Sequence, residues 1–117
     1  MPIYDLEQRT LAFAKQLREF TKRIKYSIHN KEYQKQIIRS ASSVGANYIE
    51  ANESLSGKDF IYRIKICRKE AKETIYWLNL IDVENDHDLD ELRLELRNEA
   101  DELMNIFGAI IRKKEKK

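Results

Sequence analysis

The stretch GKDFIYRIKICRKEAKETIYWLNLI, residues 57–81, decides the fold of this chain. Its apolar side chains recur at intervals of three and four residues, which is the spacing of one face of an α-helix. This stripe consists of Phe60, Ile64, Cys67, Ala71, Ile75 (or Thr74), Leu78 and Ile81. A helix with one apolar stripe has to bury it against another element. Residues 57–82 are therefore predicted to form a helix packed against others.

The same spacing recurs in three further segments, which predicts helices at roughly residues 5–27, 31–52 and 88–112. Polar breaks around residues 27–30, 52–57 and 84–88 separate the four segments. Asp5, Ser56 (followed by Asp59) and Asp88 are typical of helix starts. Short links place sequential helices antiparallel. The prediction is an all-α, antiparallel up-down-up-down four-helix bundle, a single domain over residues 1–117 with a frayed basic tail at 112–117.

The composition excludes several other classes of protein. The 117 residues are 42% hydrophobic, with three Gly and one Pro, too apolar for a disordered chain and too poor in turn residues for a many-stranded β fold. One Cys excludes an intramolecular disulfide and suits a reducing compartment. The start MPIYDLEQRT lacks the features of a signal peptide, and no apolar run approaches the length of a membrane span. A soluble, cytoplasmic protein that does not enter membranes is expected.

Two predicted helices carry more apolar surface than one core stripe requires. Ile38, Gly45 and Ile49 lie about a quarter turn or more from the core stripe of residues 31–52, and Ile66 and Trp77 lie beside the stripe of residues 57–82. A wide apolar arc can belong to a helix central in its own bundle, or one stripe can face a second copy of the chain. A mid-helix Gly45 favours close approach of another helix. These five residues are the candidates for an oligomer interface.

The net charge of +2 conceals a strong segregation. Residues 1–81 carry a net +6, residues 82–111 a net −8 and residues 112–117 a net +4. The acidic segment can lie beside basic helices and cancel their field, or a basic face can stay open for phosphate. Lys65, Arg68, Lys69 and Lys72 share one flank of their helix and are the candidate nucleic-acid contacts. No helix-turn-helix, RNP motif or zinc module accompanies them.

No residue pattern indicates catalysis, a cofactor or a metal. A di-metal bundle needs two Glu-x-x-His pairs, and the one match, Glu84 and His87, falls in a predicted loop. Cys67 is expected to be a buried core thiol. We expect Asn47, Glu50, Glu70 and Glu73 to form an interhelical hydrogen-bond network with Arg39 or Arg63. The leading hypothesis is a non-enzymatic protein; the alternatives are a metal-dependent enzyme with its site in the bundle interior, or a structural oligomer with a protein partner.

Three ordered motifs resemble one protein family: RSASSVGANYIEA at 39–51, SGKDFIYRI at 56–64 and KEAKETIYWL at 69–78. They are similar to the bacterial 23S rRNA intervening-sequence proteins, also known as four-helix bundle proteins. The resemblance covers about two thirds of the chain, from Tyr4 to about Asp82, and Gly45 stands where many members have Pro. It implies a left-handed up-down bundle that assembles into a ring, typically a homopentamer. Distant relatives are retroelement accessory proteins that engage nucleic acid. The family has no agreed catalytic residues.

Overall fold

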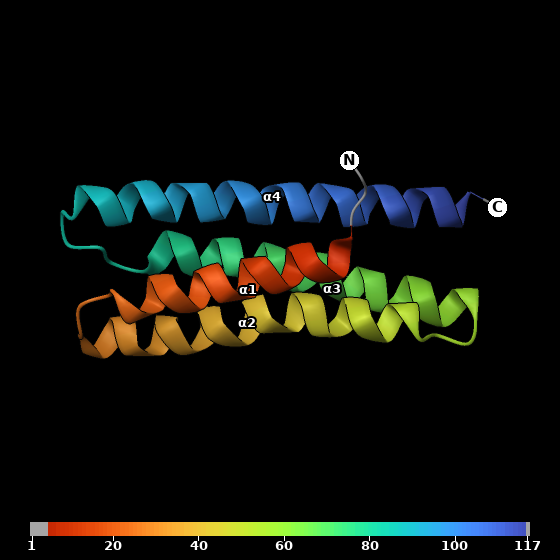
Figure 1. The fold of residues 1–117 in the computed structure, drawn as a ribbon, viewed down its shortest axis with the longest axis horizontal. Coiled ribbons are helices and arrows are strands. Elements are labelled where there is room, and N and C mark those ends of the chain that lie inside the picture. The colour runs from red at the N-terminus through yellow and green to blue at the C-terminus, as the bar shows by residue number, and fades with distance from the viewer. Residues whose placement is uncertain (1–4, 117) are drawn as a thin grey trace.

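The computed structural model describes residues 5–116, which form four helices and no strand. These are α1 (Leu6–Lys22), α2 (Ile28–Asn52), α3 (Gly57–Leu80) and α4 (His87–Glu115). Figure 1 shows that each helix runs opposite to the one before it, with short turns at the two ends of an elongated molecule. The all-α prediction is confirmed.

Side-chain caps fix where the helices begin. Asp5 accepts a hydrogen bond from the backbone N–H of Glu7 at 3.0 Å, and Ser56 accepts one from the N–H of Asp59 at 3.1 Å. Such caps satisfy N–H groups that have no partner within the helix. The starts predicted at Asp5 and Ser56 are therefore correct. The fourth helix begins one residue earlier than predicted, because Asp86 caps it by accepting the N–H of Leu89 at 3.0 Å.

The first turn differs from the prediction. The first helix ends at Lys22 instead of residue 27, and α2 begins at Ile28 instead of residue 31. The reason is that Ser27 caps α2 by accepting the N–H of Asn30 at 3.0 Å. A cap and a break have the same polar composition, so residues 27–30 were misassigned as a break.

Asn30 also connects this turn to the α3–α4 turn. Its side chain is fully buried, donates to the carbonyl oxygens of Asp82 and Lys25 at 2.8 and 3.3 Å, and accepts the N–H of Asp82 at 2.9 Å. One side chain thereby satisfies backbone groups of two connections that are far apart in sequence. This clamp holds both turns together at one end of the bundle.

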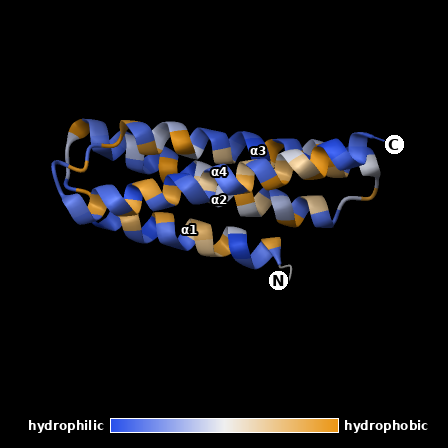
Figure 2. Cartoon of the chain, turned by 90° about the horizontal axis from the view of Figure 1, so that it is seen from above, coloured by the Kyte–Doolittle hydropathy of each residue, from blue (hydrophilic) through white to orange (hydrophobic). Residues whose placement is uncertain are grey.

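Each helix packs against its neighbours in sequence, and α1 and α4 close the bundle with the least extensive contact. Apolar and polar residues alternate along every helix (Figure 2), as expected when one stripe is buried. The third helix packs between α2 and α4, so its stripe forms the centre of the core. Residues buried in the core include Phe13, Leu17, Phe20, Ile37, Val44, Ile64, Cys67, Ala71, Leu78, Leu103 and Phe107.

The end of α4 is helical through Glu115, so the prediction of a frayed tail is wrong for residues 112–115. Two contacts with α3 hold these last turns. The ammonium group of Lys114 lies 5.1 Å from the centre of the Phe60 ring, and the carboxylate of Glu115 pairs with Lys65 at 3.0 Å. A sequence of alternating like charges does not reveal such partners on another helix.

Asn30→Ala should destabilise the protein by about 2–3 kcal/mol, because it removes three hydrogen bonds and leaves buried backbone groups unpaired. Urea unfolding followed by circular dichroism measures this change. Asn79→Ala, at an exposed position of α3 near the same turn, is the matched control and should change stability by less than about 0.5 kcal/mol. Equal effects of the two substitutions would contradict the proposed role of the clamp.

Candidate nucleic-acid interface

A polar network joins the outer surfaces of α2 and α3. Arg39 donates to Glu70 at 3.3 Å and to Glu73 at 2.6 Å. Arg63 donates to Asn47 at 2.9 Å, and Asn47 in turn bonds Ser43 on its own helix. The interhelical network expected from the sequence is confirmed for these residues. These polar groups are paired with one another and have a packing role.

Glu50 is the exception in that set. It is exposed and forms no ion pair with any residue that the structure describes. Its position on α2 follows Asn47 by three residues, which places it near the network on the helical wheel but one turn further along. The side chains of α3 that could have reached it are already paired with Arg39 and Asn47.

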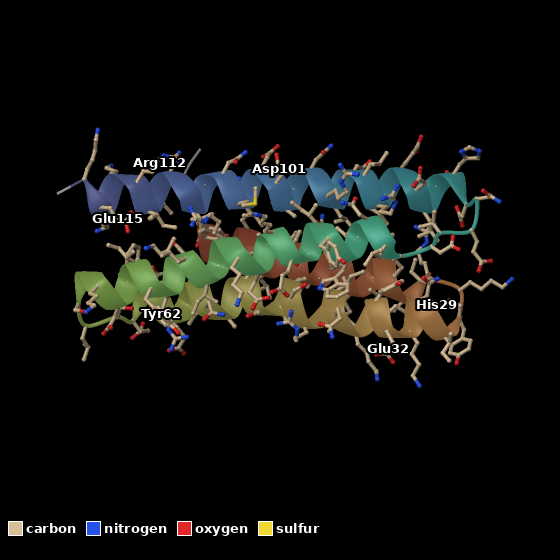
Figure 3. All side chains as sticks on the ribbon, turned by 180° about the vertical axis from the view of Figure 1, so that it is seen from behind. His29, Glu32, Tyr62, Asp101, Arg112 and Glu115 are labelled. Carbon is tan, nitrogen blue, oxygen red and sulfur yellow. The ribbon has the colours of Figure 1, made fainter. Side chains whose placement is uncertain are left out.

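The four basic candidates, Lys65, Arg68, Lys69 and Lys72, line one groove of about 500 Å³ between α3 and α4. The core stripe at Ile64, Cys67 and Ala71 orients α3, and the residues that follow each of them point toward the α4 side. The α4 wall of the groove consists of Met104, Asn105, Gly108 and Arg112. The groove lies on the side of the bundle shown in Figure 3, where α4 runs above α3.

Most of the groove's cations lack an acidic partner. Lys65 pairs with Glu115 at 3.0 Å, at the end of the groove. For Arg68, Lys69, Lys72 and Arg112, no ion pair forms within residues 5–116. Four unpaired cations lining one groove repel one another, so the arrangement favours an incoming anion.

Sequence reasoning did not assign Arg112 to this site. It was placed in the basic tail and expected to fray, whereas it occupies the α4 wall of the groove. The available signal was the spacing of Met104, Gly108 and Arg112, four residues apart on one helical face. That spacing places them together but does not say which helix they face.

The acidic residues of α4 do not cover the groove. Arg9 of α1 binds Glu99 through two hydrogen bonds of 2.7 and 2.8 Å and also binds Glu102 at 2.8 Å, so these carboxylates belong to the α1–α4 side. Asp101 projects from the outer surface of α4 (Figure 3). The acidic helix is thus partly neutralised within the bundle, while the basic groove stays open.

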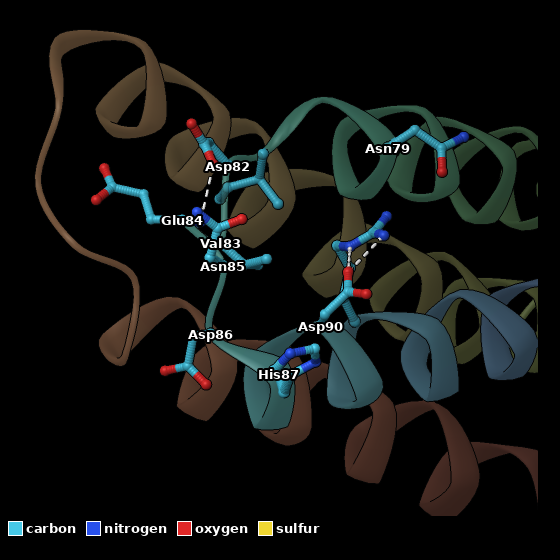
Figure 4. Close-up of a pocket in the computed structure, with 10 residues that line it drawn as sticks. Asn79, Asp82, Val83, Glu84, Asn85, Asp86, His87 and Asp90 are labelled. Carbon is cyan, nitrogen blue, oxygen red and sulfur yellow. Dashed lines mark hydrogen bonds and ion pairs between the residues drawn. The ribbon is translucent and has the colours of Figure 1, made fainter.

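The α3–α4 turn lines a second, acidic pocket, shown in Figure 4. Its polar groups mainly satisfy one another: Asp82 accepts the N–H of Glu84 at 2.8 Å, and Arg93 binds Asp90 at 2.7 Å. Glu84 and His87 are exposed there, outside the bundle interior, as the sequence indicated. Across residues 5–116, no group of three or more His, Cys, Asp or Glu side chains is arranged to hold a metal ion.

Comparison with known proteins identifies the family. The model of the 23S rRNA-intervening sequence proteins matches residues 4–109. The chain belongs to this family. A crystal structure from Bacteroides thetaiotaomicron, described as a protein of unknown function from the S23 ribosomal protein family, is similar to it, with a TM-score of 0.78 and 32% sequence identity. The similarity covers 92% of this chain and 98% of that one. A search of curated proteins finds no match.

The fold of this family member separates the five interface candidates into two surfaces. Ile38 and Ile49 are 47% and 49% exposed and follow Gln34 and Gly45 by four residues, on the flank of α2 that faces α1. Ile66 and Trp77 are half-buried on α3. Trp77 stacks on Tyr33 of α2 and meets the edge of Tyr76. The candidates therefore do not form one continuous stripe.

Gly45 is explained within a single chain. A methyl group at this position would lie 2.9 Å from the hydroxyl oxygen of Thr10 and 3.7 Å from its backbone carbonyl carbon. The close helix approach expected at Gly45 therefore exists, but the approaching helix is α1 of the same molecule. The helix-propensity argument for placing Gly45 in an intermolecular contact no longer applies.

No helix between residues 5 and 116 combines the length and the apolar character that crossing a membrane requires. Cys67 is fully buried and its thiol donates to the carbonyl oxygen of Val44 at 3.4 Å. Burial raises the pKa of the Cys67 thiol to about 12. The thiolate, which is the nucleophilic form, is therefore nearly absent at neutral pH.

Cys67 should react with a thiol reagent such as DTNB about 1000-fold more slowly in the folded protein than in guanidinium chloride at pH 8, since its pKa is about 12 instead of the usual 9. Raising the pH toward 12 should accelerate the reaction while the fold persists, because the thiolate fraction grows. Rapid labelling of the native protein at pH 8 would contradict the burial of this thiol.

Proposed function

We propose that this chain is a non-enzymatic, self-associating helical bundle that binds nucleic acid through the backbone phosphates. The observation that supports this proposal most directly is the α3–α4 groove, in which Arg68, Lys69, Lys72 and Arg112 have no acidic partner within residues 5–116. Elsewhere the arginines Arg9, Arg39 and Arg93 are paired with carboxylates. The groove is therefore a local excess of positive charge on a surface that otherwise neutralises itself.

The dimensions of the groove suit a phosphate backbone. Lys65 and Lys72 are seven residues apart, which corresponds to about 10 Å along the helix. One strand of a duplex presents a phosphate about every 3.4 Å of its axis, so the groove matches about three phosphates. No aromatic side chain lines it to stack on bases. The contacts should therefore be insensitive to base sequence and sensitive to salt.

Self-association strengthens such contacts. Three phosphate contacts give weak binding, but several grooves in one assembly raise the overall affinity because later contacts become intramolecular. The half-exposed Ile38 and Ile49 provide apolar area for association. A homopentameric ring, as the family resemblance implies, would present five grooves. The physiological partner is proposed only as RNA or DNA, the chemistry that a cationic groove recognises.

Replacing Lys65, Arg68, Lys69 and Lys72 together by Ala should weaken binding to single-stranded RNA. It should also lower the slope of log affinity against log salt by about 2, at roughly 0.7 per lost phosphate contact. Fluorescence anisotropy over a salt series measures both quantities.

The matched control replaces Lys15, Arg23, Lys31 and Lys58, which are exposed, distributed over the surface and equal in charge. It should retain most of the affinity. If both quadruple variants bind RNA equally, the groove is not the binding site.

The double substitution Ile38→Glu and Ile49→Glu should shift the protein to smaller species in light scattering, because two charges would enter an apolar contact. Leu55→Glu, at the fully exposed apex of the α2–α3 turn, is the control and should leave the mass unchanged. A wild-type protein that is monomeric at every concentration would remove the ring from this proposal.

A further inference from the structure

Gly108 forms the floor of the basic groove in the middle of α4. Glycine is the least favourable residue in a helix interior after proline, so this position requires a reason. A methyl group at Gly108 would lie 3.3 Å from Nη1 of Arg112 and 4.0 Å from both Cδ and Nη1 of Arg68. The space above the Cα of Gly108 is thus bordered by two guanidinium-bearing side chains.

This glycine differs from one that serves helix packing. At Gly45 the nearest atoms belong to the Thr10 side chain and backbone, so the missing side chain lets two helices approach. At Gly108 the three nearest atoms all belong to the side chains of Arg68 and Arg112. The missing methyl group makes room for the arginines and not for the backbone of α3.

The helix geometry explains how the two arginines meet. Arg112 follows Gly108 by four residues, and long side chains on a helix point back over the preceding turn. Arg68 reaches the same point from α3, one residue after the buried Cys67. Neither arginine forms an ion pair within residues 5–116. Two like charges directed at one point are mutually repulsive unless an anion lies between them.

We propose that Arg68 and Arg112 together bind one phosphate group above the Cα of Gly108, as a discrete site within the groove. Planar guanidinium groups donate paired hydrogen bonds that match phosphate oxygens, whereas lysine ammonium groups act as point charges. Lys65, Lys69 and Lys72 then attract the neighbouring phosphates of the same strand. This inference rests on the proposed function, because the phosphate it assigns is one of a nucleic-acid backbone.

The decisive experiment keeps the charge and changes the geometry. Arg68→Lys and Arg112→Lys should each weaken binding to a short single-stranded RNA about tenfold, because lysine cannot donate in the paired arrangement. Lys69→Arg and Lys72→Arg are the matched controls and should change the affinity by less than about twofold. Anisotropy at fixed salt measures all four.

Gly108→Ala tests the floor of the site. The added methyl group displaces Arg112, so RNA affinity should fall about fivefold while the melting temperature stays the same or rises, because alanine favours the helix. Gly57→Ala is the control, since no atom lies within 4 Å of the added methyl group. Loss of affinity with retained stability separates a binding role of Gly108 from a packing role.

Inorganic phosphate provides a readout independent of RNA. In NMR titrations, the Nε–Hε signals of Arg68 and Arg112 should shift together in wild type and not in Gly108→Ala. If the quadruple alanine variant loses RNA binding but the Arg→Lys variants do not, the discrete site is wrong and the proposed function stands. If the quadruple variant binds like wild type, the proposed function fails; the phosphate titration then decides the site, and no shift at these arginines overturns it.

Discussion

Burial of the α3 stripe is the constraint on which the rest of the structure depends. Ile64, Cys67, Ala71 and Leu78 are completely shielded from solvent, and they can be so only if α2 packs on one side and α4 on the other. Helical periodicity then determines where every other residue of α3 points. The side toward α2 carries Glu70 and Thr74, which bond Arg39 and Ser40, and the side toward α4 carries the lysines. The charge distribution of the surface thus follows from the packing of the core.

The sequence was sufficient for the helices and for the grouping of the basic residues, because both follow from local spacing. It was less reliable at the α1–α2 turn. Ser27 and Asn30 are polar in a loop and equally polar at a cap, and only the contact of Asn30 with Asp82, fifty-two residues away, decides between the two. At Thr74 the sequence left the core register open. The structure buries Thr74 completely because its hydroxyl bonds Ser40 and the carbonyl oxygen of Glu70.

The glycines show where sequence reasoning stops. Composition correctly marks Gly45 as a place where another side chain or helix comes close, but it cannot say that α1 of the same chain fills the space. Gly108 gave no signal, since its neighbours Arg68 and Arg112 come from two helices. Long-range juxtaposition depends on the relative rotation and axial shift of packed helices, which no local pattern encodes. For the same reason Arg112 was taken as part of a loose tail.

The lengths of the helices have a consequence for the dynamics of the bundle. Arg9, in the first turn of α1, contacts Glu99 and Glu102, so the last turns of α4 extend past the start of α1 (Figure 1). Around Ile111 the core is enclosed by fewer helices than around Leu96. Local opening there disrupts fewer buried contacts, and its amide hydrogens should exchange with solvent sooner than those near the α1–α4 seam. The cationic wall of the molecule is therefore also its most readily adjustable segment, able to adapt its curvature to an irregular polyanion.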